Sequence, residues 1–347
     1  MKAVVLRRNG DPSVLRLEED WPEPVAGPGD AIVAVGAVGV PYHDIVERNG
    51  TLRPGHGMPK VLGNEIAGTV IATGSEVRSL KIGDRVCATG FHTCGLCRYC
   101  RTGRETACPD RRVVSGGYAE RVAVPADALV AIPDSVDFAT ACMLGSSTAV
   151  ALGALRDIAE VKLGETVLVT GASGGVGLPA LEIARAAGAR AIGVTRSAAK
   201  ADALREAGAD AVVVAADGVD FSKDVKALTD GVGADIVVDT VGSRVFTAAF
   251  KSLAITGRYL VIGQLFREEV AINPAHILFK CAAIHGVTNA RRDQLADTVA
   301  LVAAGRIRPR VAAAFPLADA AEAHAMVESG SVTGRVVLLP QTPGTPR

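Results

Sequence analysis

The sequence predicts an α/β protein with two domains, a β-rich domain and a domain built on a doubly wound parallel sheet. Residues 1–125 hold short β-branched runs broken by Gly and Pro, a spacing typical of a compact all-β unit. In residues 146–287, apolar strand-like runs alternate with Ala-rich helical runs, which predicts parallel strands joined by right-handed crossovers. The length of 347 residues is enough for two cores at roughly 100–200 residues per domain.

The individual elements follow from the same runs. In the β-rich part we expect strands that include residues 31–35 and 68–72. The alternating part predicts strands at 166–170, 190–195, 236–239 and 259–262. It predicts helices between them at 178–187, 200–206 and 246–254. After residue 288 we expect a helix at 293–304, a strand at 335–339 and a frayed tail at 340–347.

Composition narrows the class of partner. Lys and Arg total 37, as do Asp and Glu, so no net positive field favours nucleic acid or an anionic membrane surface. No apolar stretch approaches the ~18–20 residues of a membrane span, and the first residues lack the apolar core of an export signal. We therefore expect a cytoplasmic protein that acts on a small molecule, with neither nucleic acid nor a membrane as partner.

A glycine-rich turn joins the strand at 166–170 to the helix after it. Ala172, Gly174 and Gly177 fill the three slots of the dinucleotide-binding pattern, in which small residues let backbone N–H groups approach a pyrophosphate at a helix N-terminus. Such a pattern alone also occurs in tight turns, but its place between strand and helix favours binding. The predicted cofactor-binding residues here are Ala172, Ser173, Gly174, Gly175, Val176 and Gly177.

The end of the next strand indicates which nicotinamide cofactor is bound. An NAD site places Asp or Glu there to bond the ribose 2′-hydroxyl, whereas a 2′-phosphate calls for a cation. This chain has Arg196 at that point, with Lys200 one turn further on and no carboxylate before Asp202. The sequence thus favours NADPH, with Arg196 at the phosphate and Thr195, Ser197 and Lys200 assisting; a solvated loop arginine is the alternative.

Four of the seven cysteines lie close together. Cys94, Cys97, Cys100 and Cys108 offer four thiolates within fifteen residues, enough for a closed tetrahedral site that holds one structural zinc. An iron–sulfur cluster is the competing interpretation, but the bacterial run has three residues before its last cysteine and this one has seven. We expect the remaining cysteines to be inert core residues, namely Cys87, Cys142 and Cys281.

Together these features resemble the medium-chain dehydrogenase/reductase superfamily over nearly the whole chain. The resemblance is carried, besides the cysteines and the glycine turn, by four motifs: Gly63-x-Glu65-x-x-Gly68-x-Val70, Gly83-Asp84-Arg85-Val86, Gly117-Tyr118-Ala119-Glu120 and Asp239-Thr240-Val241-Gly242. It implies a GroES-like β-barrel catalytic domain at 1–145 and 288–347 with a zinc lobe near 92–110, a Rossmann NADPH-binding domain at 146–287, and a homodimer or homotetramer. It also implies that Thr240, Gly242, Gly263 and Gln264 lie around the nicotinamide and its ribose.

The chain departs from the zinc alcohol dehydrogenases of this superfamily at three positions. Where that group holds its catalytic zinc with Cys, His and Cys, this sequence has Pro41, Asn64 and Leu144. Pro and Leu cannot ligate a metal and Asn is a poor zinc ligand, so we expect the usual catalytic zinc site to be lost. Without a Lewis acid, alcohol oxidation is unfavourable, whereas hydride addition to a conjugated carbonyl needs only hydrogen-bond donors for the enolate.

Three residues are the candidate catalytic groups: Tyr42 and Asn64 by likeness to the zinc-free quinone and enoyl reductases, and His43 because it lies where the zinc alcohol dehydrogenases keep the hydroxyl that starts their proton relay. Tyr42 is a candidate to bond the substrate carbonyl or donate a proton, or else it only lines the site. His43 is a candidate proton shuttle or a surface histidine, and Asn64 a candidate donor to the enolate. We expect Glu65 to be buried against an arginine. A rebuilt metal site of His43, Asp44, His56, Glu65 and His92 is a further alternative.

The sequence therefore predicts an NADPH-dependent reductase of a quinone, enone or enoyl thioester. Two alternatives stay open at this point. One is an alcohol or aldehyde dehydrogenase with an atypical or metal-free site, and the other is a non-catalytic NADPH-binding protein.

Overall fold

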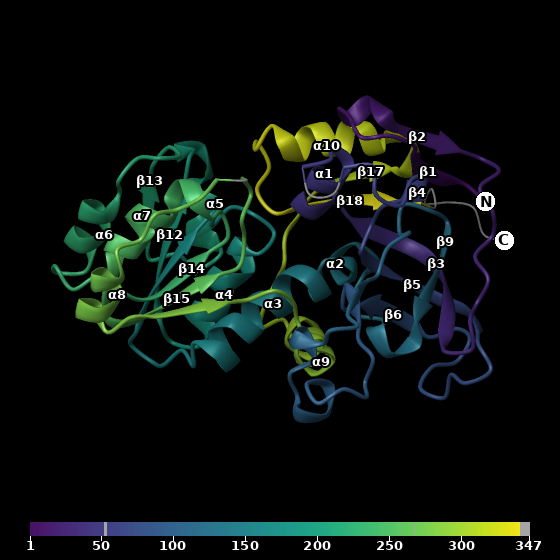
Figure 1. Cartoon of the computed structure of the whole chain (residues 1–347), viewed down its shortest axis with the longest axis horizontal. Coiled ribbons are helices and arrows are strands. Elements are labelled where there is room, and N and C mark those ends of the chain that lie inside the picture. Colours follow the sequence, from purple (N-terminus) through teal and green to yellow (C-terminus); the bar gives the residue numbers. More distant parts are fainter. Residues whose placement is uncertain (52–53, 267, 341–347) are drawn as a thin grey trace. The chain divides into compact units, whose positions relative to one another are not determined.

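The structure is a computed structural model that describes residues 1–51, 54–266 and 268–340 (Figure 1). The described chain divides into two compact units, where the sequence placed boundaries after residues 145 and 287. The first unit consists of Met1–Ala149, Asn289–Gly305 and the described chain from Pro309. The second unit consists of Val150–Thr288 and the short return segment Arg306–Arg308. The predicted frayed tail lies outside the described residues, except for Pro340.

The first unit is built mainly of short strands. Its strands are β1 (Ala3–Leu6), β2 (Leu15–Glu18), β3 (Asp30–Gly39), β4 (Lys60–Val61), β5 (Glu65–Thr73), β6 (Arg85–Ala88), β7 (Phe91–His92), β8 (Arg112–Val113), β9 (Arg121–Pro125), β10 (Leu129–Ala131), β17 (Val311–Pro316) and β18 (Arg335–Leu339). Its α-helices are α1 (Tyr42–Arg48), α2 (Phe138–Cys142), α9 (Arg292–Ala303) and α10 (Ala320–Glu328), and a π-helical turn covers Leu144–Thr148. The helix α1 corrects the expectation that residues 1–125 are all β.

These strands form mixed, open sheets. A seven-stranded sheet runs in the order β10-β6-β5-β3-β18-β17, with β9 also paired to β3, and β2-β1-β4 form a separate three-stranded sheet. Pairing is antiparallel except for β17 with β18. Among the described residues no sheet closes into a barrel, so the closed barrel that the family likeness implied is replaced by a GroES-like arrangement of open sheets.

The long strands β3 and β5 carry the core of the first unit. Their β-branched residues form a buried apolar cluster, which includes Val33, Val38, Ile66 and Val70. In the register of this pair Gly39 lies opposite Glu65, and a Cβ on Gly39 would come within 2.0 Å of the Glu65 Oε2 atom. The glycine therefore leaves room for a buried carboxylate at the end of β3.

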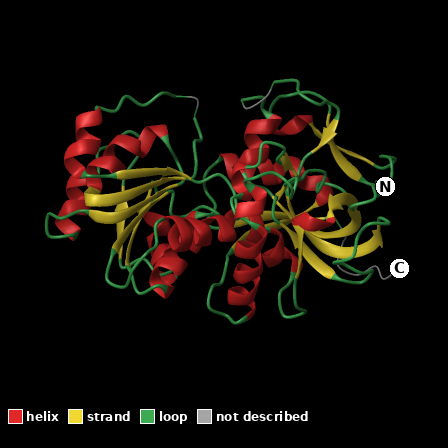
Figure 2. Ribbon diagram, turned by 60° about the horizontal axis from the view of Figure 1, so that its bottom comes forward, coloured by secondary structure: helices red, strands yellow, loops and turns green. Residues whose placement is uncertain are grey.

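The second unit is a six-stranded parallel sheet in the order β13-β12-β11-β14-β15-β16. Figure 2 shows helices on both faces of this sheet, so the prediction of a doubly wound Rossmann fold is confirmed. Its strands are β11 (Thr166–Thr170), β12 (Arg190–Thr195), β13 (Ala211–Val214), β14 (Ala234–Asp239), β15 (Leu253–Val261) and β16 (Ala283–Gly286). Its helices are α4 (Gly177–Ala186), α5 (Ala201–Glu206), α6 (Ser222–Leu228), α7 (Ser243–Ser252) and α8 (Pro274–Lys280), while α3 (Ala149–Leu152) starts at the boundary.

Successive strands are added to one side of β11 and then, from β14 on, to its other side, so the order of the strands reverses between β11 and β14. In open parallel sheets a ligand binds at the carboxyl ends of the strands at such a point. The turns after β11, β12, β14 and β15 therefore hold the positions where a dinucleotide would bind. No helix in the described part of the chain combines the length and apolar character needed to cross a bilayer.

Candidate functional site

The turn between β11 and α4 has the backbone geometry of a phosphate-binding loop. Gly171 adopts φ 60°, a left-handed conformation, and a Cβ on Gly177 would lie 2.4 Å from the Gly171 carbonyl oxygen and 2.7 Å from the Ala172 Cα atom. The third glycine thus allows the close approach of helix and turn. A Cβ on Gly174 would meet only the Gly171 oxygen, at 3.3 Å, so the second glycine leaves its outer side open.

Two cations lie next to this turn at the end of β12. The Lys200 ammonium donates to the Ser173 hydroxyl at 3.5 Å, which connects the loop after β12 to the glycine turn. Partial burial, together with the nearby Arg196 charge, lowers the pKa of Lys200 from its ordinary value. Arg196 is 60% exposed and pairs with Asp217 at 3.3 Å. Thr195 is buried, and its hydroxyl accepts from the Ser197 N–H at 3.4 Å.

Asp239 organises the turn after β14. Its buried carboxylate accepts from the hydroxyls of Thr170 and Tyr259, both at 2.6 Å, and from the N–H groups of Val241 and Gly242, both at 3.0 Å. Burial and the neighbouring Asp239 charge raise the pKa of Tyr259, so its hydroxyl stays a donor. The Asp239 carboxylate therefore holds the carboxyl ends of β11, β14 and β15 together.

The four residues predicted around the nicotinamide meet in two adjoining turns. The Thr240 hydroxyl donates to the Thr170 carbonyl at 2.8 Å. A Cβ on Gly263 would lie 2.2 Å from the backbone carbonyl oxygen of Thr240. Gly242 adopts φ 92° and faces the Gln264 side chain. Gln264 is engaged in the protein itself, because its Oε1 atom accepts from the Ser243 N–H at 2.8 Å. These contacts leave the backbone of the two turns as the part able to meet a ligand.

The four clustered cysteines form a compact lobe in the first unit. Their sulfur atoms all lie within 4.8 Å of one another, with Cys97 to Cys100 and Cys94 to Cys108 at 3.5 Å and Cys94 to Cys100 at 4.0 Å. A tetrahedral zinc with Zn–S bonds of about 2.3 Å requires sulfurs about 3.8 Å apart. The separations therefore fit one ion, whereas an iron–sulfur cluster would need space for several atoms between the thiolates.

Backbone N–H groups support the thiolate form of Cys94, whereas burial raises the pKa of the Cys100 thiol to about 12. Cys97 donates its N–H to the Cys94 sulfur at 3.4 Å, and Cys100 donates to the Cys97 sulfur at 3.5 Å. Backbone hydrogen bonds of this kind lower the pKa of the Cys94 thiol to about 7. The pair β7 and β8 closes the base of the lobe. Outside it, Cys87 and Cys142 are buried, but Cys281 is exposed because it follows α8 at the surface, so its predicted core position is wrong.

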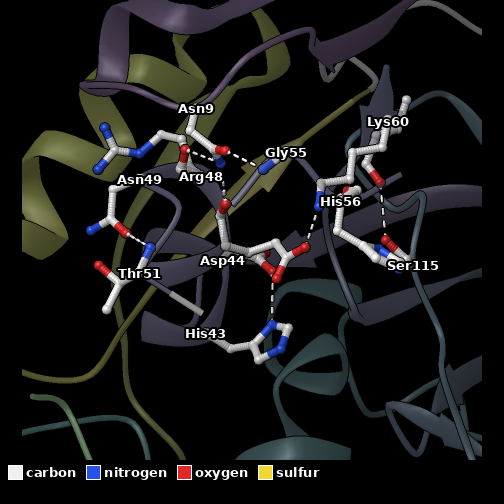
Figure 3. A network of polar contacts seen from close by, with 12 residues as sticks. Asn9, His43, Asp44, Arg48, Asn49, Thr51, Gly55, His56, Lys60 and Ser115 are labelled. Atoms are coloured by element: carbon white, nitrogen blue, oxygen red, sulfur yellow. Dashed lines mark hydrogen bonds and ion pairs between the residues drawn. The ribbon is translucent and has the colours of Figure 1, made fainter. Parts of the chain in front are cut away.

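The helix α1 carries Tyr42 and His43 on its first turn, after Pro41. The His43 Nδ1 atom lies 3.5 Å from Oδ1 of the buried Asp44 (Figure 3), while the His43 side chain is 38% exposed. Tyr42 is half-buried and its ring packs against the core of the first unit. The far end of α1 is fixed by Asn9, whose amide donates to the carbonyls of Glu47 and Arg48 at 2.9 and 3.0 Å.

Asn64 and Glu65 lie at the start of β5. The Glu65 Oε1 atom accepts from the Ser146 hydroxyl at 2.7 Å and pairs with Arg335 of β18 at 3.0 Å. Burial is the largest influence on this carboxyl and raises its pKa, while Arg335 and Ser146 oppose the shift. Asn64 is buried beside Gly90, and its Oδ1 atom has no hydrogen-bond partner among the described residues. Arg335 is thus the arginine that the sequence predicted for Glu65 without identifying it.

A second buried polar contact joins α10, the last helix of the first unit, to the loop before β9. The Tyr118 hydroxyl and the His324 Nε2 atom are 2.9 Å apart, and both residues are fully buried. Burial lowers the pKa of His324 to about 3, and the charge of Arg48 acts in the same direction. Burial, followed by the nearby Asp44 carboxylate, raises the pKa of Tyr118. His324 is therefore a neutral structural histidine at physiological pH.

The residues proposed for a rebuilt metal site have other contacts. The His92 Nδ1 atom pairs with Asp127 at 2.8 Å, and the Glu65 carboxylate pairs with Arg335 at 3.0 Å. Within the described ranges, the only group of three or more His, Cys, Asp or Glu side chains arranged to hold a metal is the cysteine lobe. Pro41 and Leu144, two of the three positions that hold zinc in the alcohol dehydrogenases, are both buried.

Comparison with known proteins defines the class. The chain matches the family model of the alcohol dehydrogenase GroES-like domain over residues 27–134 and that of the zinc-binding dehydrogenase over residues 175–304. It is 32% identical to the acryloyl-coenzyme A reductase of Sulfurisphaera tokodaii over 345 residues, which cover 98% of this chain and 100% of that protein. The chain belongs to the medium-chain dehydrogenase/reductase superfamily and is an oxidoreductase of that class.

Solved structures agree with this assignment. The crystal structure of AibC superposes with a TM-score of 0.91 at 41% identity and covers 99% of this chain and 96% of that one. The Escherichia coli quinone oxidoreductase complexed with NADPH gives a TM-score of 0.82 at 27% identity, with 98% of this chain and 100% of that one covered. The fold is therefore shared over the whole length of both proteins.

Two polar residues that contact Glu65 were not singled out from the sequence. Arg335 lies at the opposite end of the chain from Glu65, and Ser146 lies in an irregular helical turn. A charged residue within an apolar strand, as Arg335 is in Arg-Val-Val-Leu-Leu, signals a buried partner, but it does not name that partner.

Proposed function

We propose that this protein is an NADPH-dependent reductase of a conjugated carbonyl compound, a quinone, enone or enoyl thioester. The observation that carries the proposal is the set of residues at the three zinc-holding positions of the alcohol dehydrogenases, Pro41, Asn64 and Leu144. Two of these cannot bind a metal, and the third is an amide suited to donating a hydrogen bond. The polar groups left at the site therefore favour stabilising an enolate over activating an alcohol.

The reduction needs two contributions from the first unit. Hydride addition to the β-carbon moves charge onto the carbonyl oxygen, where the Asn64 amide is the proposed donor, with the Tyr42 hydroxyl as a second candidate. His43, half-exposed and 3.5 Å from Asp44, is proposed to pass protons between solvent and the site. The acryloyl-coenzyme A and quinone reductases among the relatives support a conjugated acceptor.

The cofactor proposal rests on the second unit. Backbone groups of the glycine turn, residues 172–177, are proposed to hold the pyrophosphate. Lys200 and Arg196 are proposed to hold a 2′-phosphate, with Thr195 and Ser197 beside them, because two cations lie at this point and Lys200 reaches Ser173 of the turn. The backbone of Thr240, Gly242, Gly263 and Gln264 is proposed to line the nicotinamide side.

The cysteine lobe is proposed to hold one structural zinc through Cys94, Cys97, Cys100 and Cys108. With all four positions filled by thiolates, the ion has no open place for a substrate, and its contribution is to order the lobe.

We also propose that the protein forms a homodimer or homotetramer. The exposed apolar side chains of Leu278 and Phe279 on α8 support this proposal. Light scattering after gel filtration measures the mass of the particle and tests it.

A turnover assay tests the proposed reaction. Loss of NADPH absorbance is followed with a quinone, an enone and an enoyl thioester, and NADP⁺ reduction is followed with primary and secondary alcohols. The proposal expects turnover with at least one conjugated acceptor and a clear preference for NADPH over NADH. Turnover with alcohols alone would contradict it.

The alternative activity is oxidation of an alcohol or aldehyde. It is favoured by the alcohol dehydrogenase family models and by the contact between His43 and Asp44, a pair able to accept a proton without metal. In the same assay it predicts reduction of NADP⁺ by alcohols. A non-catalytic NADPH-binding protein predicts cofactor binding with no turnover on any acceptor.

A further inference from the structure

We propose that Ser146 donates the proton that completes the reduction, and that Glu65 supplies this proton through the Ser146 hydroxyl. The proposal rests on the proposed reduction of a conjugated carbonyl and adds a catalytic residue and a positioning residue to it. Neither residue needs a metal for this role.

The backbone presents Ser146 differently from its neighbours. Residues 144–148 form a π-helical turn, a rare geometry that often occurs where a helix re-aims a side chain at a functional site. In the stretch from Ala141 to Ala149, Ser146 and no other residue is partly exposed. The neighbouring Ser147 is fully buried, and its hydroxyl donates to the Met143 carbonyl within the helix. Ser146 is therefore the hydroxyl of this turn that a substrate can reach.

Behind Ser146 lies a carboxyl group with an uneven environment. The Glu65 Oε1 atom receives both the Ser146 hydroxyl at 2.7 Å and Arg335 of β18 at 3.0 Å. Its Oε2 atom is buried and has no hydrogen-bond partner among the described residues. If the carboxyl were ionised, its Oε2 atom would lose its hydration without gaining a hydrogen bond, and this favours the protonated form.

Charges around Glu65 act in both directions. Asp44, from α1, disfavours a second negative charge nearby, whereas Arg335 and His43 favour it. Burial exceeds these effects and raises the pKa of Glu65 above that of an exposed glutamate. Glu65 can therefore hold a proton at a pH where an exposed glutamate would have lost it. In the structure the Ser146 hydroxyl donates to the Glu65 Oε1 atom, so the proposed relay requires this hydrogen bond to reverse, with the carboxyl proton on Oε1 and the Ser146 hydroxyl turned toward the substrate.

Ser146 and Asn64 border the same space. An atom attached to the Cα of Gly90 would lie 3.4 Å from the Ser146 Cβ atom and 3.8 Å from the Asn64 Nδ2 atom. Gly90 has φ 82° and no side chain, and an added Cβ would be in ordinary van der Waals contact with both residues, so Ser146 and Asn64 meet at the same point beside Gly90. A carbonyl group in this space has the Asn64 amide for its oxygen and the Ser146 hydroxyl near its α-carbon.

The proton transfer balances as follows. The β-carbon of the substrate receives a hydride, the chemistry that bound NADPH supplies, so the C=C π bond breaks and its electron pair becomes an enolate. The Ser146 hydroxyl gives its proton to the α-carbon and takes the Glu65 proton in its place. Glu65 is left as a carboxylate beside Arg335, and a solvent proton returns through Ser146 after product release. One NADPH and one proton are consumed for each double bond reduced.

The test replaces Ser146 by alanine and uses Ser147→Ala as the matched control from the same turn. The substrate is an enone with a substituent on the α-carbon, reduced in D₂O. Loss of a positioned proton donor lowers kcat/KM by roughly 10²–10⁴-fold in Ser146→Ala, whereas Ser147→Ala keeps a rate near that of the wild type. Wild type gives one configuration at the deuterated α-carbon, and Ser146→Ala gives a mixture because the enolate is protonated by solvent.

Two further measurements separate the roles of Ser146 and Glu65. Because the donor must be protonated, kcat/KM of the wild type falls as pH rises through the pKa of Glu65, and this decline is absent in Ser146→Ala. Without any substrate, the infrared carbonyl band of the protonated Glu65 carboxyl shifts to higher frequency in Ser146→Ala because its hydrogen bond is lost. Ser146→Thr, which keeps a hydroxyl, restores a single product configuration.

The outcomes distinguish this proposal from the proposed function. If wild type reduces no conjugated carbonyl at all, the proposed function fails. If wild type reduces the enone and Ser146→Ala does so with the same rate, product configuration and pH profile, the proton-donor role of Ser146 is overturned. Loss of the single configuration in Tyr42→Phe, with Ser146→Ala unaffected, would assign the donation to Tyr42.

Discussion

Replacing Lys200 by alanine is expected to weaken the binding of NADPH while leaving that of NADH nearly unchanged. Lys200 lies at the end of β12, where its ammonium donates to Ser173 in the glycine turn. Its partial burial lowers its pKa, which shows that the folded protein holds this charge at a cost. A dianionic phosphate beside it would offset that cost, whereas the 2′-hydroxyl of NADH would not.

The magnitude follows from the contacts. A hydrogen bond to a charged group contributes about 1.5–3 kcal/mol, which corresponds to roughly a 10–100-fold increase in Kd for NADPH in Lys200→Ala. Arg196 is 60% exposed and already paired with Asp217, so an exposed ion pair of about 0.2–1 kcal/mol is the better guide. Arg196→Ala is therefore expected to raise the Kd by no more than about fivefold.

Titration calorimetry with NADPH and NADH in parallel provides the assay. Arg205→Ala is the matched control, because Arg205 lies on the neighbouring helix α5 and pairs with Asp202 at 2.7 Å. The control should leave both affinities unchanged. If Lys200→Ala leaves the ratio of the two Kd values as in the wild type, Lys200 does not hold a 2′-phosphate and the proposed cofactor preference loses its main support.

Three other substitutions test separate parts of the structure. Cys97→Ser removes one of four thiolate ligands, so zinc content and Tm should both fall, as followed by elemental analysis and calorimetry. Gly177→Ala places a methyl group 2.4 Å from the Gly171 carbonyl oxygen, and NADPH binding should be lost to a greater extent than in Gly174→Ala, whose added methyl meets the same oxygen at 3.3 Å. The pKa of His324 is about 3 in the folded state and ~6.5 in the unfolded state, so only the unfolded state takes up a proton at this histidine as pH falls from 7.5 to 5.5. This uptake lowers the free energy of unfolding of the wild type by about 1.4 kcal/mol over that range, and His324→Asn should not show this loss.

Each of these has a result that contradicts it. Full zinc content in Cys97→Ser would show that this thiolate is not a ligand. Equal NADPH affinities in the two glycine variants would remove the argument for close approach at Gly177. For His324, urea denaturation at the two pH values compares the loss in the variant with that in the wild type, and equal losses would show that His324 is not held neutral by burial.

Two strands of the second unit, β11 and β12, have the predicted bounds, whereas β13 and β16 were not predicted. The predicted segments 166–170 and 190–195 have apolar centres, with Gly or charged residues at or next to their ends. The terminal strand at 335–339 agrees for the same reason. The helix expected at 293–304 begins one residue earlier, at Arg292. Sharp changes of polarity at both ends make such elements readable without tertiary information.

Other elements gave a weaker signal. Ala320–Glu328 forms the helix α10, but its many alanines give little contrast between a buried and an exposed face, and the sequence did not predict it. The helix α1 was also missed, because seven residues after a Pro give less than two turns of pattern. The exposed position of Cys281 could not be inferred either, since Cys281 itself adopts the left-handed conformation that ends α8.

The candidate site shows the same division. The four clustered cysteines and the glycine turn are local in sequence, so their spacing alone predicted that their side chains or backbone groups lie close together. The contacts of Glu65 are not local: Arg335 and Ser146 come from segments far away along the chain, and only the pairing of β18 with β3 and of β3 with β5 brings Arg335 to it. Partners supplied by strand pairing cannot be read from spacing.

The central claim, that the chain reduces a conjugated carbonyl without a catalytic metal, is tested most directly by metal content. Protein purified without added zinc and passed through gel filtration is analysed for metal per chain, together with the Cys97→Ser variant. The account predicts one zinc per chain in the wild type and a loss of that zinc in the variant. Two zinc ions per chain, with one retained in Cys97→Ser, would contradict it, because a second metal would then be bound outside the cysteine lobe and alcohol oxidation would become the better explanation.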